Sequence, residues 1–467
     1  MLKRFLSNCN SPQHNNSFLF LQNRCIISAM SNKLSKKFYV SLTIFSLIGQ
    51  IAWVIENMYF NVFIYKMFHA SAAQISVMVA ASAVTAAVTT LLIGALSDKV
   101  GRRKIFLCAG YAFWGVSILS FGLIKMDVLT KITGSVVAAA TLGCNLVIIM
   151  DCVMTFFGSS ANDACFNAWL TDMGDDTNRG KIEGINAMMP LISVLVVFGS
   201  FMSFDLNKAE SWTSIFFIIG GVVIMVGGLG FFLIDDSKSR ELLRNAKEEN
   251  SHYFKNIFYS FKPSVIKQNY MLYVILAAFA IFNISIQIFM PYLILYYEQS
   301  LKLDNYVLIM APAIIAAAVV TIFYGRVYDK YGFEKSVIPV VVTLLAGYVF
   351  LYFFTNIVLV FIGSLLMLSG FLSGMAVFGA MVRDFTPQNK TGMFQGIRII
   401  AQVLIPGVIG PAIGAAVLKN AEKIANGDGT ESFIPNHNIY LAAFIAGLFI
   451  FLAVWGVSCL RKKSSTN

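Results

Sequence analysis

The sequence predicts an all-α integral membrane protein with twelve transmembrane helices, arranged as two pseudo-symmetric bundles of six. Composition is the first reason, since 57% of the 467 residues are hydrophobic and only 13% are charged. A soluble chain of this length needs a larger polar share to cover its surface. Long apolar runs with few charges are the second reason, because they are typical of membrane-spanning helices. The third is an internal repeat, in which "GALSDKVGRRKI" at Gly94 returns in altered form as "GRVYDKYGFEKS" at Gly325.

Each expected span is near or above the ~20 residues that cross a bilayer as a helix. The basic residues between the spans are distributed unevenly. With a cytoplasmic N-terminus, about 27 Lys and Arg fall on the inner side and about 7 on the outer side. The sequence therefore predicts a multi-pass protein of the plasma (inner) membrane with both termini in the cytoplasm. The twelve expected spans are 38–65, 73–96, 105–124, 145–172, 182–205, 212–234, 268–297, 306–328, 336–354, 357–383, 392–418 and 438–460.

Charge and polar segments define the partners and the domain organisation. The formal charge of +11 does not indicate nucleic acid, because the basic residues lie between apolar runs and not on one soluble face. The expected partners are a small-molecule solute and the lipid bilayer, and the chain is expected to be a monomer. Residues 1–29 are expected to be disordered or to precede a second start at Met30, with a short interfacial helix as the alternative. The expected order is a leader, a first bundle, a cytoplasmic linker, a second bundle and a tail, at 1–37, 38–235, 236–267, 268–460 and 461–467.

The repeat relates the two bundles residue by residue. A shift of 231 residues places Asp98 on Asp329, and a second match with a shift of 212 residues places Asp172 on Asp384. The difference between the shifts predicts an insertion between the third and fourth spans, for which 126–144 is the candidate. We expect this segment to lie outside the cell or to lengthen the neighbouring helices.

Two six-span halves joined by an inner linker resemble the major facilitator superfamily. The loop motif Gly94-x-x-x-Asp98-x-x-Gly101-Arg102-Arg103-Lys104 is similar to the superfamily's motif between helices 2 and 3, and the resemblance covers essentially all of 38–460. It implies an inner latch that holds the halves together. The alternative is that the basic residues only keep this loop inside.

In such a latch, Asp98 is expected to face the N-terminus of helix 11 near Thr391 and Gly392, where free N–H groups and the helix dipole favour an anion. Arg102 is expected to pair with Asp172. A charged corner below helices 4 and 5 is either a second gate or a plain salt-bridge cluster. The gating candidates are Gly94, Asp98, Gly101, Arg102, Arg103, Asp172, Arg179, Glu183, Asp329 and Asp384.

Charged residues inside the spans are the candidates for a transport site, because a charge in a membrane is costly. Glu56 lies in helix 1, Asp163 in helix 4 and Arg398 in helix 11. Their alternative role is structural pairing between helices. Asp151 is expected near the outer end of helix 4, where water is close. No histidine lies in an expected span, which excludes a histidine relay.

Polar side chains recur at helical spacing around these charges and are expected to line one central cavity. Trp53 is either a platform that stacks on a sugar or ordinary packing. The stripes are Gln50, Trp53, Asn57 and Asn61 in helix 1, Ser159, Asp163 and Asn167 in helix 4, and Gln395, Arg398 and Gln402 in helix 11. The expected solute-binding residues are Trp53, Asn57, Asn61, Asn167, Gln287, Arg398 and Gln402.

Desolvation penalises the charged form of a carboxyl group. Glu56 and Asp163 are therefore expected to take up a proton on one side of the membrane and release it on the other, an effect that Arg398 nearby would oppose. The expected coupling ion is H⁺, and no other cofactor is expected.

Within the superfamily, "WVIENMYFNVFIY", "GSSANDACFNAWLTD" and "GMFQGIRIIAQVLIPGVIGP" resemble the bacterial glycoside–pentoside–hexuronide:cation symporters and the related sucrose carriers. This resemblance implies a sugar or glycoside substrate. Melibiose-type sodium carriers place acids on helix 2, and 73–96 contains none, which favours protons over sodium.

Other classes of function are weighed against this one. The sequence has no Ser/His/Asp set, metal cluster or phosphate loop, so neither an enzyme nor a catalytic or metal-binding residue is expected. A drug or lipid exporter of the same fold would have a larger apolar cavity, and the many Asn and Gln residues argue mildly against it. A membrane sensor without transport would need a soluble signalling domain, for which the linker and tail are too short.

Overall fold

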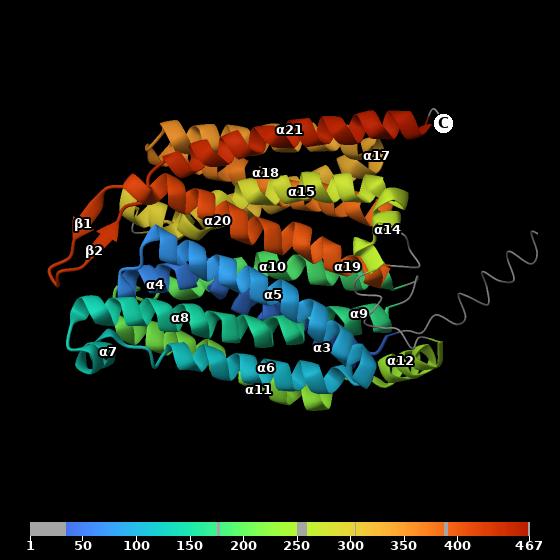
Figure 1. Cartoon of the computed structure of the whole chain (residues 1–467), viewed down its shortest axis with the longest axis horizontal. Helices are drawn as coiled ribbons and strands as arrows, with labels where there is room; N and C mark the ends of the chain where they lie inside the picture. The colour runs from blue at the N-terminus through green and yellow to red at the C-terminus, as the bar shows by residue number, and fades with distance from the viewer. Residues whose placement is uncertain (1–33, 175–177, 250–258, 304, 387–390, 466–467) are drawn as a thin grey trace, which may run out of the picture.

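The computed structural model describes residues 34–174, 178–249, 259–303, 305–386 and 391–465, and most of them are helical (Figure 1). Eleven helical segments in this part are long and apolar enough to cross a membrane. One of them, α17 (Val307–Phe353), contains two of the predicted spans, because Gly332 breaks the helical backbone with φ 75° and ψ −178°. The prediction of twelve spans is therefore confirmed.

The helices of the first half run from Lys36 to Leu233, and those of the second half from Tyr270 to Ser465. The first half contains α3 (Lys36–Val54) continued by α4 (Phe60–Phe68), α5 (Ala72–Val100), α6 (Arg103–Phe121), α8 (Val136–Gly158) continued by α9 (Asn167–Met173), α10 (Arg179–Phe201) and α11 (Ala209–Leu233). The second half contains α15 (Tyr270–Phe289) continued by α16 (Leu293–Leu295), α17, α18 (Ile357–Phe385), α19 (Thr391–Ile399) continued by α20 (Ile405–Val417), and α21 (Asn438–Ser465). The short helices α7 (Met126–Thr133), α12 (Ser237–Glu249) and α14 (Pro263–Gln268) connect spans.

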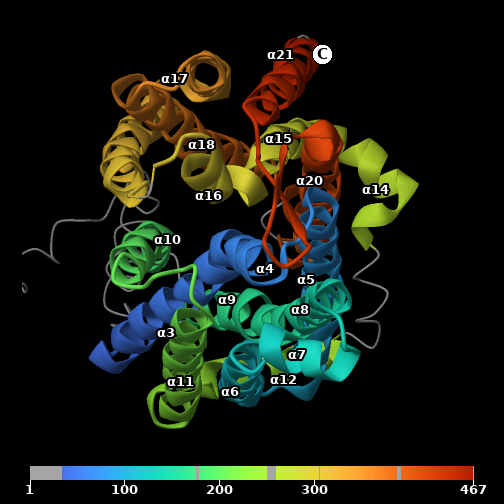
Figure 2. The ribbon, with the colours of Figure 1, turned by 90° about the vertical axis from the view of Figure 1, so that its left-hand side faces the viewer.

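The two halves lie side by side, with α3–α11 on one side and α15–α21 on the other (Figure 2). Helix α5 packs along α20 between them, and α10 contacts α17. After α20 the chain forms an antiparallel hairpin of β1 (Lys423–Ala425) and β2 (Glu431–Phe433), which projects from one end of the bundle (Figure 1). We call this the hairpin end, and the opposite end, where Gly101 separates α5 from α6, the motif end.

The fourth span begins at Val136 and not at 145 as predicted. The expected insertion, 126–144, forms α7 and also lengthens the span. Gly134 ends α7 in the left-handed region at φ 71°, and the apolar residues after Ser135 continue as helix. The predicted boundary was wrong because these small apolar residues are consistent with either a loop or a helix. The prediction for 1–29 falls outside the described residues.

Helices α17 and α18 approach so closely that their backbones nearly touch. A Cβ atom on Gly370 would lie 2.5 Å from Cα of Leu344, and one on Gly347 would lie 2.3 Å from the backbone N of Met367. Helices in a membrane associate through such close packing of small residues, because lipid is as apolar as the helix surface. Glycine at these positions therefore sets the distance between α17 and α18.

Gly370→Ala is expected to destabilise the protein by about 1–3 kcal/mol, the usual cost of overpacking. Gly228→Ala in α11 is the matched control, since a Cβ there meets no atom within 4 Å. The control should be neutral or slightly stabilising because Ala favours helix by about 1 kcal/mol over Gly. The midpoint of thermal unfolding in detergent measures both, and equal midpoints would contradict the close approach.

Candidate functional site

Four π-helical turns interrupt the spans, and each contains a polar residue of interest. They are Ile55–Tyr59 with Glu56, Ser159–Phe166 with Asp163, Tyr296–Ser300 with Glu298, and Ile400–Leu404 with Gln402. A π-turn is rare and is frequent at functional sites, because its extra residue redirects the side chains that follow. Local backbone geometry therefore marks the predicted positions Glu56, Asp163 and Gln402.

Glu56 is buried at the contact of helices 1, 2 and 4, with 7% of its surface exposed. Its Oε1 accepts hydrogen bonds from Ser82 Oγ at 2.6 Å and Thr155 Oγ1 at 2.8 Å, and the two hydroxyl oxygens are 2.8 Å apart. Its Oε2 has no hydrogen-bond partner among the described residues. A carboxyl group with one bonded and one free oxygen, away from water, can hold a proton on the free oxygen.

Asp151 lies deeper than predicted, and this expectation was wrong. It is 2% exposed, because the fourth span starts earlier than expected and places Asp151 well inside it. It precedes Thr155 by one helical turn and interacts electrostatically with Glu56. Its Oδ1 has no hydrogen-bond partner in the described part of the chain. Asp151 was not predicted as a transport-site residue, although an acid within an apolar run is enough to indicate a functional site in a membrane.

Asp163 is half-buried in the π-turn of helix 4. Its Oδ2 accepts a hydrogen bond from Ser159 Oγ at 2.9 Å, and its charge acts on Glu56. The two carboxyl groups singled out from the sequence therefore lie within electrostatic range of each other. Asn167, exposed one turn further on, donates to the backbone carbonyl of Asp163 at 3.2 Å.

The polar residues of helix 1 that were expected to share one face do not all do so. Asn57 is exposed, whereas Asn61 is 1% exposed and donates to the backbone carbonyl of Asn57 at 2.9 Å. The expected shared face fails because the π-turn Ile55–Tyr59 adds a residue between the first and last members. Trp53 packs on Trp114 with ring centroids 5.1 Å apart, and Trp53 Nε1 has no described hydrogen-bond partner. An indole N–H without an acceptor can serve a solute.

The second half contributes Gln287, Arg398 and Gln402, all half-buried. Arg398 Nε donates to Gln402 Oε1 at 3.3 Å, and Gln402 Nε2 lacks a described partner. The charges that act on Arg398 are those of Arg383 and Glu183. Neither Glu56 nor Asp163 is among the charges that act on Arg398.

At the motif end, Arg103 makes the ion pair with Asp172 that was expected of Arg102, and a second ion pair with Asp98. Arg103 Nη2 lies 2.6 Å from Asp98 Oδ1, and Nε lies 2.6 Å from Asp172 Oδ2. Nη1 donates to Ser97 Oγ at 3.1 Å. Arg102 is exposed at the N-cap of α6. The assignment was wrong because Arg103 is the buried first residue of α6, whereas Arg102 stays outside the helix at the N-cap.

This ion-pair network joins helices 2, 3 and 4 of one half. Gly101 permits the turn with φ 75°, whereas a Cβ at Gly94 would lie 4.0 Å from Ala164 Cβ, an ordinary contact. The expected contact of Asp98 with Thr391 and Gly392 concerns side chains outside the described part, as does the side chain of Arg179.

The remaining gating candidates lie at the surface of the motif end. Glu183 and Asp329 are exposed. Neither forms an ion pair within the described residues. Asp384 accepts a hydrogen bond from the hydroxyl group of Tyr328. The second copy of the motif therefore lacks the buried network of the first among the described residues.

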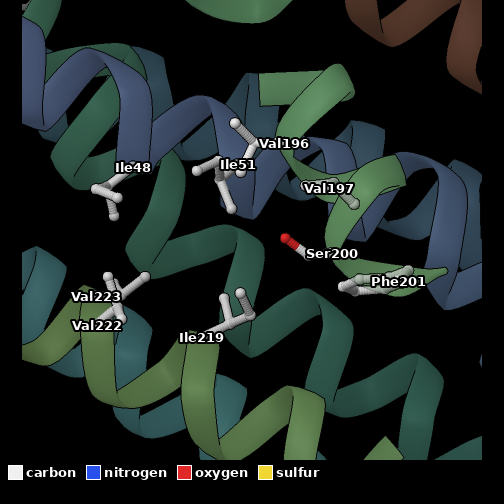
Figure 3. A pocket seen from close by; sticks show the side chains of 9 residues that line it. All are labelled: Ile48, Ile51, Val196, Val197, Ser200, Phe201, Ile219, Val222 and Val223. Atoms are coloured by element: carbon white, nitrogen blue, oxygen red, sulfur yellow. The ribbon is translucent and has the colours of Figure 1, made fainter. Parts of the chain in front are cut away.

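A separate cavity of about 140 Å³ lies in the first half, between α3, α10 and α11 (Figure 3). Ser200 is its one polar lining residue, and Ile48, Ile51 and Val223 are among the apolar ones. No predicted solute-binding residue lines it. A lining of this kind offers hydrocarbon contacts but almost no hydrogen bonds to a sugar.

Two six-span halves with buried polar groups between the spans define a multi-pass membrane transporter fold. The sequence profile of the Major Facilitator Superfamily matches residues 38–411, and the chain belongs to this family. No curated protein matches the sequence.

Solved structures share the fold at low sequence identity. The nucleoside transporter NupG is 12% identical over 92% of this chain and 100% of its own, with a TM-score of 0.62. The xylose transporter XylE from E. coli, in a partially occluded inward-open conformation, is 14% identical over 89% and 97%, with a TM-score of 0.63. A bacterial homologue of the human lysosomal transporter Spinster, inward-facing and occupied, is 13% identical over 92% and 98%, with a TM-score of 0.65.

Arg103→Gln is expected to destabilise the protein by about 3–5 kcal/mol, because it removes the buried guanidinium group that pairs with the half-buried acids Asp98 and Asp172. Arg102→Gln is the matched control and should change the free energy of unfolding by less than about 0.5 kcal/mol, as an exposed position does. Thermal unfolding in detergent compares them. A larger loss in the Arg102 variant would show that the ion pairs are assigned to the wrong arginine.

Proposed function

We propose that this chain is a secondary active transporter that moves a small organic solute, a sugar or glycoside, together with protons by alternating access. The observation that carries the proposal is the Glu56 carboxyl group, buried in helix 1 with a free Oε2 and two hydroxyl groups on Oε1. A charged carboxylate is costly to bury in a membrane, so a buried carboxyl group in a transporter fold is a candidate for binding a proton.

The solute is assigned to exposed and half-buried polar side chains from both halves. Trp53, Asn57 and Asn167 come from the first half, and Gln287 and Gln402 from the second. Amide groups and an indole ring suit a neutral, hydroxyl-rich solute, because they supply both donors and acceptors and an apolar face. The proposed membrane is the plasma membrane, with both termini in the cytoplasm.

Thermal unfolding against a panel of mono- and disaccharides, glycosides and amphipathic drugs tests the substrate class. A ligand that binds the folded state raises the free energy of unfolding by mass action, by about 2.7 kcal/mol at a hundredfold excess over its Kd, and so raises the midpoint of unfolding. A dose-dependent rise with one sugar class is expected. Flat responses to sugars, with rises for several amphipathic drugs, would support an exporter instead.

Glu56→Gln and Asp163→Asn are expected to abolish accumulation of the solute against its gradient while leaving exchange intact, because an amide cannot carry the proton. Asp205→Asn is the matched control, since Asp205 is an exposed acid in the loop between α10 and α11. Uptake into proteoliposomes with an imposed pH gradient measures accumulation, and counterflow measures exchange. Normal accumulation by the Glu56 variant would remove Glu56 from the coupling role, and loss of exchange would assign it to solute binding.

A further inference from the structure

At the hairpin end, a buried ion pair joins the two halves. Lys66 Nζ, at the end of helix 1, lies 2.7 Å from Glu298 Oε2, at the end of helix 7, and the side chains are 9% and 11% exposed. The described ion pairs of the motif end, by contrast, stay within the first half. Lys66 and Glu298 therefore link parts of the molecule that must separate if this end opens.

The β1–β2 hairpin fastens the end of helix 1 to the second half. Tyr65 Oη donates to the backbone carbonyl of Phe433 at 2.6 Å, and the two rings meet edge to face with centroids 5.3 Å apart. His69, next to the end of the helix with φ 52°, contacts Ser432 Oγ through Nδ1 at 3.2 Å. The hairpin thus holds the residues on either side of Lys66.

The hairpin also carries a charge toward helix 1. The hydroxyl and amide groups of Thr430 hold the pKa of Asp428 below its usual range, so Asp428 stays ionised. Asp428 Oδ2 lies 3.4 Å from His69 Nε2. Whether or not His69 is charged, this contact adds to the attachment between helix 1 and the hairpin.

Aromatic side chains extend the inter-half contact toward the membrane interior. The hydroxyl groups of Tyr59 and Tyr306 are 3.1 Å apart, and Phe198 lies edge to face with Tyr306 at 6.1 Å. Tyr292 Oη donates to the backbone carbonyl of Ala72 at 3.0 Å. These contacts join the two halves next to the ion pair.

An ion pair is suited to a contact that must both hold and release. Its Coulomb attraction is offset by the desolvation of both charges, so the net stabilisation of a buried pair is small. When water enters, both charges regain hydration and the pair separates at low cost. Apolar surfaces that separate gain no favourable hydration, so an apolar contact of the same area costs more to open.

We propose that Lys66, Glu298 and the β1–β2 hairpin form a clasp that closes the hairpin end, and that this clasp must open in each transport cycle. The opening of the clasp in a transport cycle rests on the proposed function. The closure of the hairpin end does not, because it is a property of the folded chain. Lys66 and Glu298 act through the position of helices 1 and 7 and do not bind the solute.

Spin labels at Lys131 and Thr355 report the opening of this end. Both positions are exposed at the hairpin end, one in each half, and the native cysteines are first replaced. Double electron–electron resonance should give one short distance between the two labels in the parent chain. Lys66→Met and Glu298→Gln should each raise the population of longer distances at least fivefold. The charge exchange Lys66→Glu with Glu298→Lys should restore the short distance.

Lys423→Met is the matched control, because Lys423 forms an exposed pair with Glu431 at 2.8 Å in the same hairpin. It should leave the distances unchanged. A double variant, Lys66→Met with Glu298→Met, guards against misfolding, since an apolar pair is often neutral or stabilising. It should stay closed and slow counterflow at least fivefold.

Parent-like distances in Lys66→Met and Glu298→Gln, or no recovery in the charge exchange, would overturn the clasp. A clasp that opens as expected in a protein that neither binds nor transports any solute tested would leave the clasp standing and remove the proposed function. Normal sugar uptake with unchanged distances in the Lys66 and Glu298 variants would overturn the clasp and leave the proposed function standing.

Discussion

The low polarity around the spans is the constraint on which the rest of the structure depends. An unpaired charge in hydrocarbon is so costly that it must find a partner inside the bundle. Arg103 finds Asp98 and Asp172 on neighbouring helices, and Glu56 finds hydroxyl groups on two others. These contacts, which satisfy polar groups, therefore also fix the position of one helix against another. The stability of the first half and the geometry of its site have the same physical cause.

The internal repeat distinguishes residues that the fold requires in both halves from residues that serve only one half. Gly101 and Gly332 occupy matching positions and both have φ 75°, a backbone conformation that only glycine adopts without strain. The position that matches Arg103 is Glu334, so the second copy cannot build the same ion-pair network with an acid. The turn is thus retained in both halves because the chain must reverse there, whereas among the described residues the buried network is found in the first half.

The spans were predictable because hydrophobic length is a local property of the sequence. Glu56 and Asp163 could be singled out because a charged residue inside an apolar run is costly in a membrane. Asp151 was misplaced because its depth depends on a helix start that small apolar residues do not define. The π-turns, and with them the burial of Asn61, arise from packing between helices and leave no mark in the pattern. The hairpin was missed although Asn426-Gly427 and Asp428-Gly429 are turn signals between short runs.

The two ends of the bundle are built from different chemistry, and this difference bears on how a proton could move the halves. The ion pairs of Arg103 tie helices 2, 3 and 4 to one another at the motif end. Lys66–Glu298 joins the halves, and Lys66 lies ten residues beyond Glu56 on helix 1, a rise of about 15 Å. Glu56 bonds to helices 2 and 4, so in the proposed coupling a proton gained or lost there would change how helix 1 sits against those helices. Because the same helix carries Lys66, coupling and closure of the hairpin end would then require no separate path between them.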